Sequence, residues 1–356
     1  MTTIGSIAVL GLGKVGNLVA TLLVEGGFAV RGVDVDSDRQ IEGVEIFAAD
    51  LANPESITAS LAGCDAVVSC LPYNLNIAIA DVAAANGLHY FDLTEDVPTT
   101  DHIRGLTSNS EILMAPQCGL APGFISIVGA SLAAQLDSCR SLRLRVGALP
   151  QNPTGLLGYA FNWSAAGVVN EYLNDCEVIE EGVRKFVSPM EWHEIIHLNG
   201  TELEAFTTSG GLGTMCETML DSVDNLDYKS LRYPGHMIQM NFFFHELLMR
   251  EDRAKAQEIL TTAKPPVDAD VVHVHVAAEG TVDGALVRKE FVRSYLPMEI
   301  AGESRTAISW TTAASLVAVV EMANSGGLPE RGFVHQEHIR LDDFFSSRTG
   351  RLYDLR

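Results

Sequence analysis

The sequence predicts an α/β protein with a parallel sheet in its N-terminal part and an α+β domain with a mainly antiparallel sheet after it. Three observations lead to this prediction: a glycine-rich turn between an apolar run and an amphipathic helix, a regular alternation of strand and helix patterns, and a later change to hairpin signals. A chain of 356 residues is also longer than one hydrophobic core usually organises. We therefore expect a first domain over residues 1–120, a second over 121–304, and a final segment, 305–356, that packs back on the first domain.

The first element is a short buried strand over residues 6–10, followed by the turn Gly11-Leu12-Gly13-Lys14-Val15-Gly16. Beyond this turn, apolar residues recur with the spacing of one helix face. A glycine pattern between a strand and a helix is the fingerprint of the Rossmann dinucleotide-binding domain. Gly11 permits the tight turn, Gly13 lets the backbone approach a pyrophosphate, and Gly16 lets the helix pack on the strand. The free N–H groups at the helix start attract the phosphate charge.

The second strand, 29–33, is followed by Asp34, which lies 18 residues after Gly16. In Rossmann domains an acid near this position binds the ribose hydroxyls of the adenosine. A carboxylate would repel a 2′-phosphate, so the sequence favours NAD, although Arg31 and Arg39 are close enough to keep NADP possible. The alternative is that the glycines form an ordinary strand–helix turn.

Strand and helix patterns continue to alternate up to about residue 115. The predicted strands are 44–48, 66–69, 89–92 and 112–115, and helices are expected from Asn53-Pro54 onward and over 74–86. Such alternation implies right-handed crossovers, a parallel sheet, and a ligand at the carboxyl ends of the strands. The residues that we predict to bind the cofactor are Gly11, Gly13, Lys14, Val15, Gly16, Asp34, Val35, Asp50, Leu51, Cys70, Leu71 and Pro72.

The pattern changes after about residue 136. Three turn signals, Glu181-Gly182, Asn199-Gly200 and Asp283-Gly284, are flanked by alternating or β-branched residues, which predicts three hairpins. These hairpins are expected within residues 176–187, 192–206 and 271–292. Two further stretches have the apolar spacing of helix faces. They are Met240, Phe243, Phe244, Leu247 and Leu248, and then Trp310, Ala313, Ala314 and Val317.

Composition narrows the class of protein. A chain with 47% apolar and 20% charged residues is typical of a folded globular protein. Its formal net charge of −22 disfavours nucleic acid and anionic membranes as partners. The six cysteines include no C-x-x-C pair, no signal peptide is expected, and no apolar run approaches the ~20 residues of a membrane helix. We therefore expect a cytoplasmic protein with reduced thiols.

One motif suggests a metal but is better explained otherwise. His193-Glu194-Ile195-Ile196-His197 matches the H-E-x-x-H pattern of zinc peptidases, which needs a helix so that both histidines reach one ion. Here the segment runs directly into the turn signal Asn199-Gly200, so a strand is expected, and four residues of a strand span about 13 Å. We therefore predict no metal site, and interpret His273 and His275 as strand-surface residues.

Six blocks of the sequence have a recognisable pattern, namely 11–16, 70–73, 119–123, 159–164, 204–206 and 231–236. In these blocks the sequence resembles the saccharopine dehydrogenase-like family, and most closely its lysine 6-dehydrogenase branch. The resemblance runs along nearly the whole chain and implies NAD(P)-linked oxidation of a lysine-type amine, a homodimer or larger assembly, and a C-terminal helix that returns to the first domain. One departure is Asp92-Leu93-Thr94-Glu95, where relatives often carry a small serine-containing segment, so the choice between lysine and another amine or amino acid stays open.

Oxidation of an amine carbon needs a base. Hydride leaves readily only when the nitrogen has a free lone pair, whereas an alkylammonium titrates near ~10.4. The candidates for the group that takes the proton are Asp92 and Glu95, with Tyr73 as a polar neighbour. The alternatives are a helix cap or ribose contact for Asp92, and a solvated loop acid for Glu95.

The substrate also needs groups that hold its distal carboxylate. Arg232 can pair bidentately with a carboxylate, or it can be a structural arginine that holds a turn. Trp163 is a candidate wall of the pocket, with core packing as the alternative, and His236 is a candidate proton relay. Two competing functions remain: a saccharopine-type reductase or dehydrogenase, and a non-catalytic protein that senses NADH.

Overall fold

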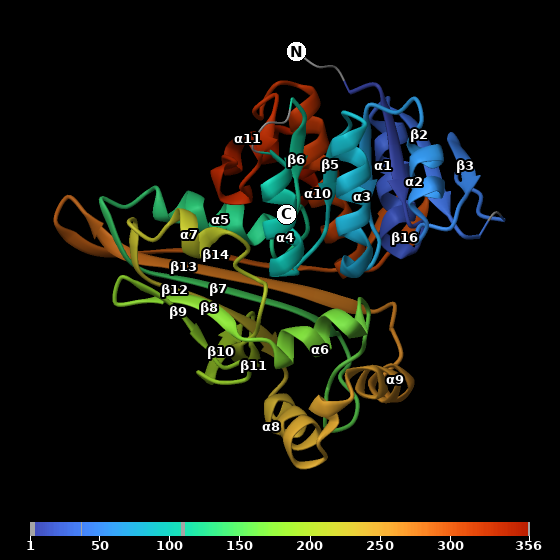
Figure 1. Cartoon of the computed structure of the whole chain (residues 1–356). Coiled ribbons are helices and arrows are strands. Elements are labelled where there is room, and N and C mark those ends of the chain that lie inside the picture. Colours follow the sequence, from blue (N-terminus) through green and yellow to red (C-terminus); the bar gives the residue numbers. More distant parts are fainter. Residues whose placement is uncertain (1–3, 37, 108–110, 355–356) are drawn as a thin grey trace. The chain divides into compact units, whose positions relative to one another are not determined.

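The computed structural model describes residues 4–36, 38–107 and 111–354, and the chain divides into two compact units (Figure 1). Unit 1 comprises Met1–Ile127 and Ser309–Arg356, and unit 2 comprises Val128–Ile308. Among the described residues, no helix is both long and apolar enough to cross a bilayer.

Unit 1 contains a parallel sheet of seven strands, which confirms the predicted Rossmann-type architecture. Its strand order is β17-β6-β5-β4-β1-β2-β3, so the chain starts at the centre of the sheet and crosses over between β3 and β4. The strands are β1 (Ser6–Leu10), β2 (Ala29–Asp34), β3 (Val44–Ala48), β4 (Ala66–Ser69), β5 (His89–Asp92), β6 (Leu113–Ala115) and β17 (Gly332–Phe333).

Apolar helices cover this sheet. On one face α2, α3 and α4 pack side by side, and α3 and α4 are easily followed in Figure 1. Arg348 joins α1 to α10, because its guanidinium donates to the Leu22 carbonyl at 2.5 Å and pairs with Glu321 at 2.9 Å. The helices that lie wholly or partly in unit 1 are α1 (Lys14–Glu25), α2 (Pro54–Leu61), α3 (Tyr73–Ala85), α4 (Val97–Leu106), α5 (Phe124–Ala133), α10 (Ala307–Asn324) and α11 (Leu341–Ser346).

Unit 2 is organised around an eight-stranded sheet, with the main order β10-β11-β12-β7-β13-β14 and with β8 and β9 attached to β12. All of its strand pairs are antiparallel except β12 with β7, which confirms a mainly antiparallel sheet. The strands are β7 (Ser138–Pro150), β8 (Cys176–Glu180), β9 (Val183–Val187), β10 (Glu194–Leu198), β11 (Thr201–Thr207), β12 (Val223–Arg232), β13 (Asp270–Val282) and β14 (Ala285–Tyr295).

The three predicted hairpins form at the predicted turns. In each turn both central residues have positive φ, for example 51° at Asn199 and 81° at Gly200. Glycine at the second position and asparagine, aspartate or glutamate at the first adopt this two-residue turn, whose twist matches that of the strands. A fourth, shorter hairpin, β15 (Met298–Ile300) with β16 (Glu303–Arg305), was not among the predictions.

Short helices pack on one part of the unit 2 sheet and bury an apolar core with it. The helix predicted around residues 240–248 forms only in part, since helical structure continues from α8 through a π-helical turn and ends at Glu246. Met240 and Phe244 are buried, but a π-helical turn follows α8, and Leu247 and Leu248 are exposed. The helical elements are α6 (Ala165–Leu173), α7 (Met215–Thr218), α8 (His236–Asn241), the π-helix η2 (Phe242–Glu246), η3 (Met249–Glu251) and α9 (Arg253–Ala263).

Candidate functional site

The glycine turn of unit 1 has the geometry of a phosphate-binding loop. Gly11 has a φ of 83°, and its N–H donates to the Val33 carbonyl at 2.8 Å, which ties the turn to β2. A Cβ on Gly16 would lie 1.8 Å from the Gly11 carbonyl oxygen, so only glycine permits this packing. A Cβ on Gly13 would meet no atom within 4 Å, so the backbone faces open space there. The residues present therefore fit a pyrophosphate at this helix start.

Two charged groups flank the turn. Asp34 accepts a hydrogen bond from the Leu12 N–H at 2.7 Å and one from the Asp36 N–H at 3.1 Å, so its carboxylate holds the turn in place. This side chain is half-buried, and a carboxylate has about four acceptor positions, which leaves capacity for ribose hydroxyls. Lys14, the first residue of α1, is exposed, and Val15 is half-buried.

The other predicted cofactor residues lie at the same carboxyl edge of the parallel sheet. Leu71 forms a wall of the glycine turn, because its Cδ2 lies 2.8 Å from where a Cβ of Gly11 would be. Cys70 donates its N–H to the Leu10 carbonyl, Pro72 precedes α3, and Tyr73 is the half-buried first residue of that helix.

The predicted residues after β2 and β3 differ in exposure. Val35 is 74% exposed beside Asp34. Asp50 is exposed and accepts from the Ala52 N–H at 3.0 Å, so it closes the turn after β3. Leu51 packs in the core of unit 1 and can support this edge only through its backbone.

Asp92, at the end of β5, is fully buried in a hydrogen-bond network. One oxygen accepts from the Thr94 and Gln117 N–H groups at 3.0 and 2.9 Å. The other accepts from the Tyr90 hydroxyl at 2.7 Å and the Asn76 amide at 3.3 Å. Burial raises the pKa of Asp92 to about 6 in spite of these donors. Because the carboxylate is enclosed by protein groups, its geometry favours a role in organising the loops and not contact with a substrate.

Glu95 is in a different situation three residues later. Its side chain is half-buried, and burial raises its pKa to about 7, with the negative charges of Asp96 and Asp92 adding to the rise. Asp96 has a structural role, since it caps α4 by accepting from the N–H and hydroxyl of Thr99. A carboxyl that titrates near neutral pH can exchange protons with a bound molecule.

The predicted residues of unit 2 form a buried chain of hydrogen bonds. Nε of Arg232 donates to the Tyr172 hydroxyl at 2.7 Å, and this hydroxyl lies 3.0 Å from Nε2 of His236. Nδ1 of His236 lies 2.8 Å from the Leu157 carbonyl, which only accepts, so Nδ1 carries the proton and Tyr172 donates to Nε2. Burial, together with the charge of Arg232, lowers the pKa of His236 to about 3, so this imidazole is neutral.

Aromatic rings surround this chain. The guanidinium carbon of Arg232 lies 4.7 Å from the centre of the Tyr159 ring, and Arg232 is only 3% exposed. Trp163 is half-buried, and its indole N–H donates to the Tyr159 hydroxyl at 3.2 Å. Of the three predicted substrate-binding residues, Trp163 is therefore the most accessible, whereas Arg232 and His236 are enclosed.

Sequence reasoning assigned no role to two residues of this cluster. Glu204 accepts from the N–H groups of Gly235 and Met237 at 3.0 and 2.6 Å, and so holds the start of α8. The block Glu204-Ala205-Phe206, which carries part of the family resemblance, pointed to the importance of Glu204 but did not indicate that it holds a helix start. Tyr172 had no signal, because its partners Arg232 and His236 are distant in sequence.

The H-E-x-x-H segment enters strand β10 at Glu194, directly after His193, as its turn signal predicts. Glu194 pairs with Arg145 at 2.5 Å and with Lys229 at 3.1 Å, and Asp227 also pairs with Arg145 at 2.6 Å, so two acids offset two buried cations. The interpretation of His273 and His275 as strand-surface residues is wrong, because they are only 5% and 7% exposed; they bond to Ser294 and Glu290 of β14. In the described part of the chain, no three His, Cys, Asp or Glu side chains gather in a way that could hold a metal ion.

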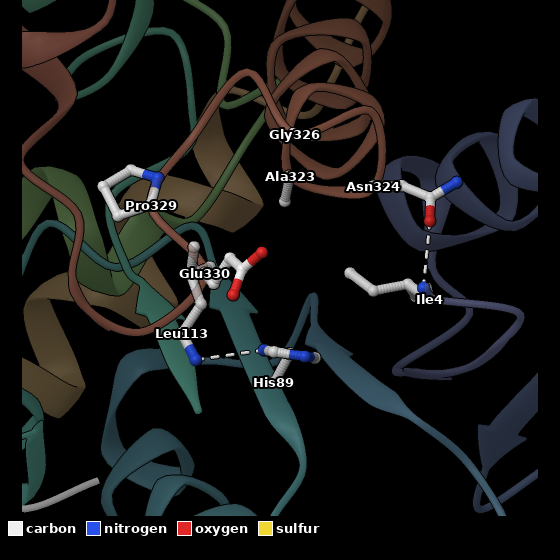
Figure 2. Close-up of a pocket in the computed structure, with 8 residues that line it drawn as sticks. All are labelled: Ile4, His89, Leu113, Ala323, Asn324, Gly326, Pro329 and Glu330. Carbon is white, nitrogen blue, oxygen red and sulfur yellow. Dashed lines mark hydrogen bonds between the residues drawn. The ribbon is translucent and has the colours of Figure 1, made fainter. Parts of the chain in front are cut away.

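A small pocket in unit 1 lies away from the glycine turn (Figure 2). His89 and Leu113, which begin β5 and β6, line it, so it belongs to the amino ends of the strands. Nδ1 of His89 accepts from the Leu113 N–H at 3.0 Å, and Asn324 accepts from the Ile4 N–H at 2.9 Å. Its volume of about 20 Å³ holds little more than one water molecule, so it is not a substrate pocket.

Two family models match the chain. Residues 7–114 match the saccharopine dehydrogenase NADP binding domain, and residues 119–347 match the saccharopine dehydrogenase C-terminal domain. The chain belongs to the saccharopine dehydrogenase family. This saccharopine dehydrogenase family member is therefore an oxidoreductase whose N-terminal part binds NAD(P).

Solved structures share the fold of this family member. The saccharopine dehydrogenase (L-Glu forming) from Saccharomyces cerevisiae aligns with a TM-score of 0.76 at 14% identity, over 96% of both chains. The DAP dehydrogenase of C. glutamicum in complex with DAP aligns with a TM-score of 0.51 at 10% identity, over 99% of this chain and 98% of that one. An engineered D-amino acid dehydrogenase bound to NADP+ also aligns at 0.51, with 12% identity over 96% of both chains.

Proposed function

We propose that the protein is an NAD-dependent dehydrogenase that oxidises the side-chain amine of lysine or a related amino acid at its C–N bond. One observation carries the proposal. Glu95, a half-buried carboxyl with a pKa raised to about 7, follows β5 at the sheet edge that also carries the glycine turn of the NAD(P)-binding unit. The family of the chain supports the oxidoreductase class.

The reaction requires a proton acceptor before the C–H bond breaks. The amine arrives as an ammonium ion with a pKa near ~10.4, and it has no lone pair until a proton leaves. Glu95 in its ionised form takes this proton, and its negative charge also attracts the cation. When bound, NAD(P)+ would accept a hydride, which is two electrons and one proton, from the carbon. Starting from the ammonium ion, the products are a protonated imine, NAD(P)H and the one proton that Glu95 has taken. Water then hydrolyses the imine, or the substrate's own amino group adds to it.

Two acids support a preference for NAD over NADP. Asp34 is the last residue of β2 and Asp36 follows it, so a 2′-phosphate there would meet their negative charge. Arg39, a cation that could bind such a phosphate, pairs with Asp36 at 3.4 Å. We therefore expect the ratio of kcat/KM values to favour NAD.

For the substrate, we propose that Trp163 makes contact while Arg232 and His236 position the residues around it. Arg232 stacks on Tyr159, and Tyr159 accepts the indole N–H of Trp163, so the cation fixes the aromatic pair from within the core. The six cysteines are free thiols, which supports a proposed location in the reducing cytoplasm.

A second candidate is a saccharopine-type dehydrogenase, which acts on a secondary amine that joins two amino acids. It is favoured by the family models over both parts of the chain. The same base chemistry applies, since this nitrogen must also lose a proton before the C–H bond breaks.

The test is a substrate panel with each cofactor, followed by the absorbance of the reduced nicotinamide. Lysine, ornithine, a diamine and saccharopine are compared with NAD and with NADP. Glu95→Gln should lower kcat by roughly 100-fold or more, whereas Glu202→Gln, which changes a glutamate that is 57% exposed, should have no effect. Turnover of saccharopine alone would select the second candidate, and no amine-dependent reduction with any substrate would refute both.

A further inference from the structure

A cavity of about 600 Å³ opens within unit 2, and none of the residues discussed for the candidate site lines it. Its walls come from α5, the start of β7, the turn at Gly182 between β8 and β9, and the segment that leads into β12. We call this space the α5 cavity. Cavities that bind small organic molecules have volumes of roughly 300–1,000 Å³, so the α5 cavity has the size of a ligand site.

The α5 cavity exists because small side chains face it. The Ala134 N–H donates to the Ala130 carbonyl at 2.9 Å, so helical structure continues past the end of α5. Cys139 and Val223 are neighbours across the parallel strands β7 and β12, and both belong to the buried, apolar part of the lining. Three alanines with the i, i+3, i+4 spacing of one helix side leave the space open, namely Ala130, Ala133 and Ala134.

Hydrogen bonds fix the loops that surround the cavity. The Gly182 N–H donates to the Asp224 carbonyl at 2.8 Å, which ties the β8–β9 turn to the start of β12. On another side, the carboxylate of Asp137 accepts from the Asp283 N–H at 2.7 Å. The shape of the cavity is therefore present before a ligand binds, which lowers the entropy that binding must remove.

The charges of the lining indicate a cationic ligand. Three exposed acids line the cavity, namely Asp137, Asp221 and Asp224. Among the residues that the structure describes, none of these acids forms an ion pair, and no lysine, arginine or histidine lines the cavity. Burial raises the pKa of the Cys139 thiol and the charge of Asp224 adds to the rise, so the negative potential reaches the buried part of the lining.

The spacing of these acids distinguishes between kinds of cation. Over the described residues, no three Asp, Glu, His or Cys side chains gather closely enough to hold a metal ion, so the three carboxylates do not meet at one point. A single small ion cannot contact all of them. An aliphatic chain with several ammonium groups can, and its methylene groups are favourably buried against the apolar lining.

We propose that the α5 cavity binds an aliphatic polyamine, with ammonium groups on Asp137, Asp221 and Asp224 and with the methylene chain over the alanines of α5. Asp137 can take part although it already accepts one hydrogen bond, because a carboxylate has about four acceptor positions.

Calorimetric titration of the full chain with spermine, an aliphatic tetraamine, tests the proposal. One spermine molecule should bind per chain, roughly 10-fold or more tightly than hexylamine, which has a single ammonium group. Asp221→Asn with Asp224→Asn removes two of the charged contacts and should weaken spermine binding by roughly 10-fold. Ala134→Phe keeps every charge but fills the cavity from an exposed position, and it should weaken binding to a similar extent.

Two controls separate the cavity from general attraction to an acidic chain. Glu202→Gln with Glu258→Gln removes two acids of unit 2 that are 57% and 68% exposed and lie outside the lining, so it should leave the affinity within about twofold. Glu95→Gln should also have no effect, because the site does not depend on the proposed base. Thermal melting without spermine shows whether each variant is folded.

Four outcomes would overturn the proposal. They are no spermine binding to the wild type, equal affinity for hexylamine, weaker spermine binding in either control, and unchanged binding in both the double-aspartate variant and Ala134→Phe.

Discussion

Replacement of Asp92 by asparagine tests whether the buried carboxylate organises the carboxyl edge of the sheet. Asp92 accepts two hydrogen bonds at each oxygen, from Thr94 and Gln117 on one side and from Tyr90 and Asn76 on the other. An asparagine has one oxygen and one NH2 group, so on either side two donors lose their acceptor. A buried donor left without a partner costs about 1–3 kcal/mol, which places the loss for Asp92→Asn at about 2–6 kcal/mol at about pH 7, where the carboxylate is ionised.

The destabilisation caused by Asp92→Asn should also depend on pH. Burial raises the pKa of Asp92 from 3.8 to about 6, so the folded protein holds this proton more tightly than the unfolded chain does. The contribution of Asp92 to the free energy of unfolding is therefore largest below the pKa that this residue has in the unfolded chain. It falls as the pH rises toward about 6 and stays at the lower level above that pH, and the total fall is about 3 kcal/mol. Asparagine does not ionise. The destabilisation by Asp92→Asn should thus be larger at about pH 4 than at about pH 7, by roughly 3 kcal/mol.

The assay must report on unit 1 alone, because a chain of two units need not unfold in one step. Trp310 is 1% exposed and belongs to unit 1, so urea unfolding is followed by its fluorescence in a background with Trp163→Phe and Trp192→Phe. Asp101→Asn, at a side chain that is 62% exposed, is the control and should change stability by less than about 0.5 kcal/mol. A destabilisation by Asp92→Asn that is equal at both pH values would refute the reasoning.

Two further predictions concern other parts of the molecule. Gly16→Ala should lower both the stability of the protein and its affinity for NAD(P)H, since the new Cβ would lie 1.8 Å from a carbonyl oxygen. Gly13→Ala should lower only the affinity, because its Cβ faces open space. Thermal melting measures the stability and fluorescence titration the affinity, and equal behaviour of the two variants would contradict the assignment of the turn. Tyr172→Phe leaves the buried Nε of Arg232 without an acceptor and should destabilise unit 2 by about 2–4 kcal/mol. The control Tyr233→Phe loses one hydrogen bond to the Pro150 carbonyl and should cost about 1 kcal/mol. Denaturant unfolding measures both losses, and similar values would show that the Arg232–Tyr172 hydrogen bond contributes no more to stability than an ordinary one.

Local features of the sequence were enough to predict the elements that depend on local conformation. The glycine turn and the hairpin turns, such as Asn199-Gly200, form where expected because few residues other than glycine and asparagine adopt positive φ readily. The same turn signal correctly indicated that the H-E-x-x-H segment is a strand. The helix expected around residues 240–248 ends at Glu246, because the apolar spacing does not distinguish an α-turn that buries leucine from a π-turn that exposes it.

The sequence by itself determined the order of strands and helices, the phosphate-binding turn and the class of fold, because each depends on residues that are neighbours in the chain. Only the tertiary structure decided what the charged side chains do. Asp92 meets donors up to 25 residues away, and Arg232 meets Tyr172 across 60 residues, so neither partnership has a local pattern. The same holds for Glu95, whose proton affinity is set by how much water the folded chain removes from its carboxyl, a quantity that no spacing of residues contains.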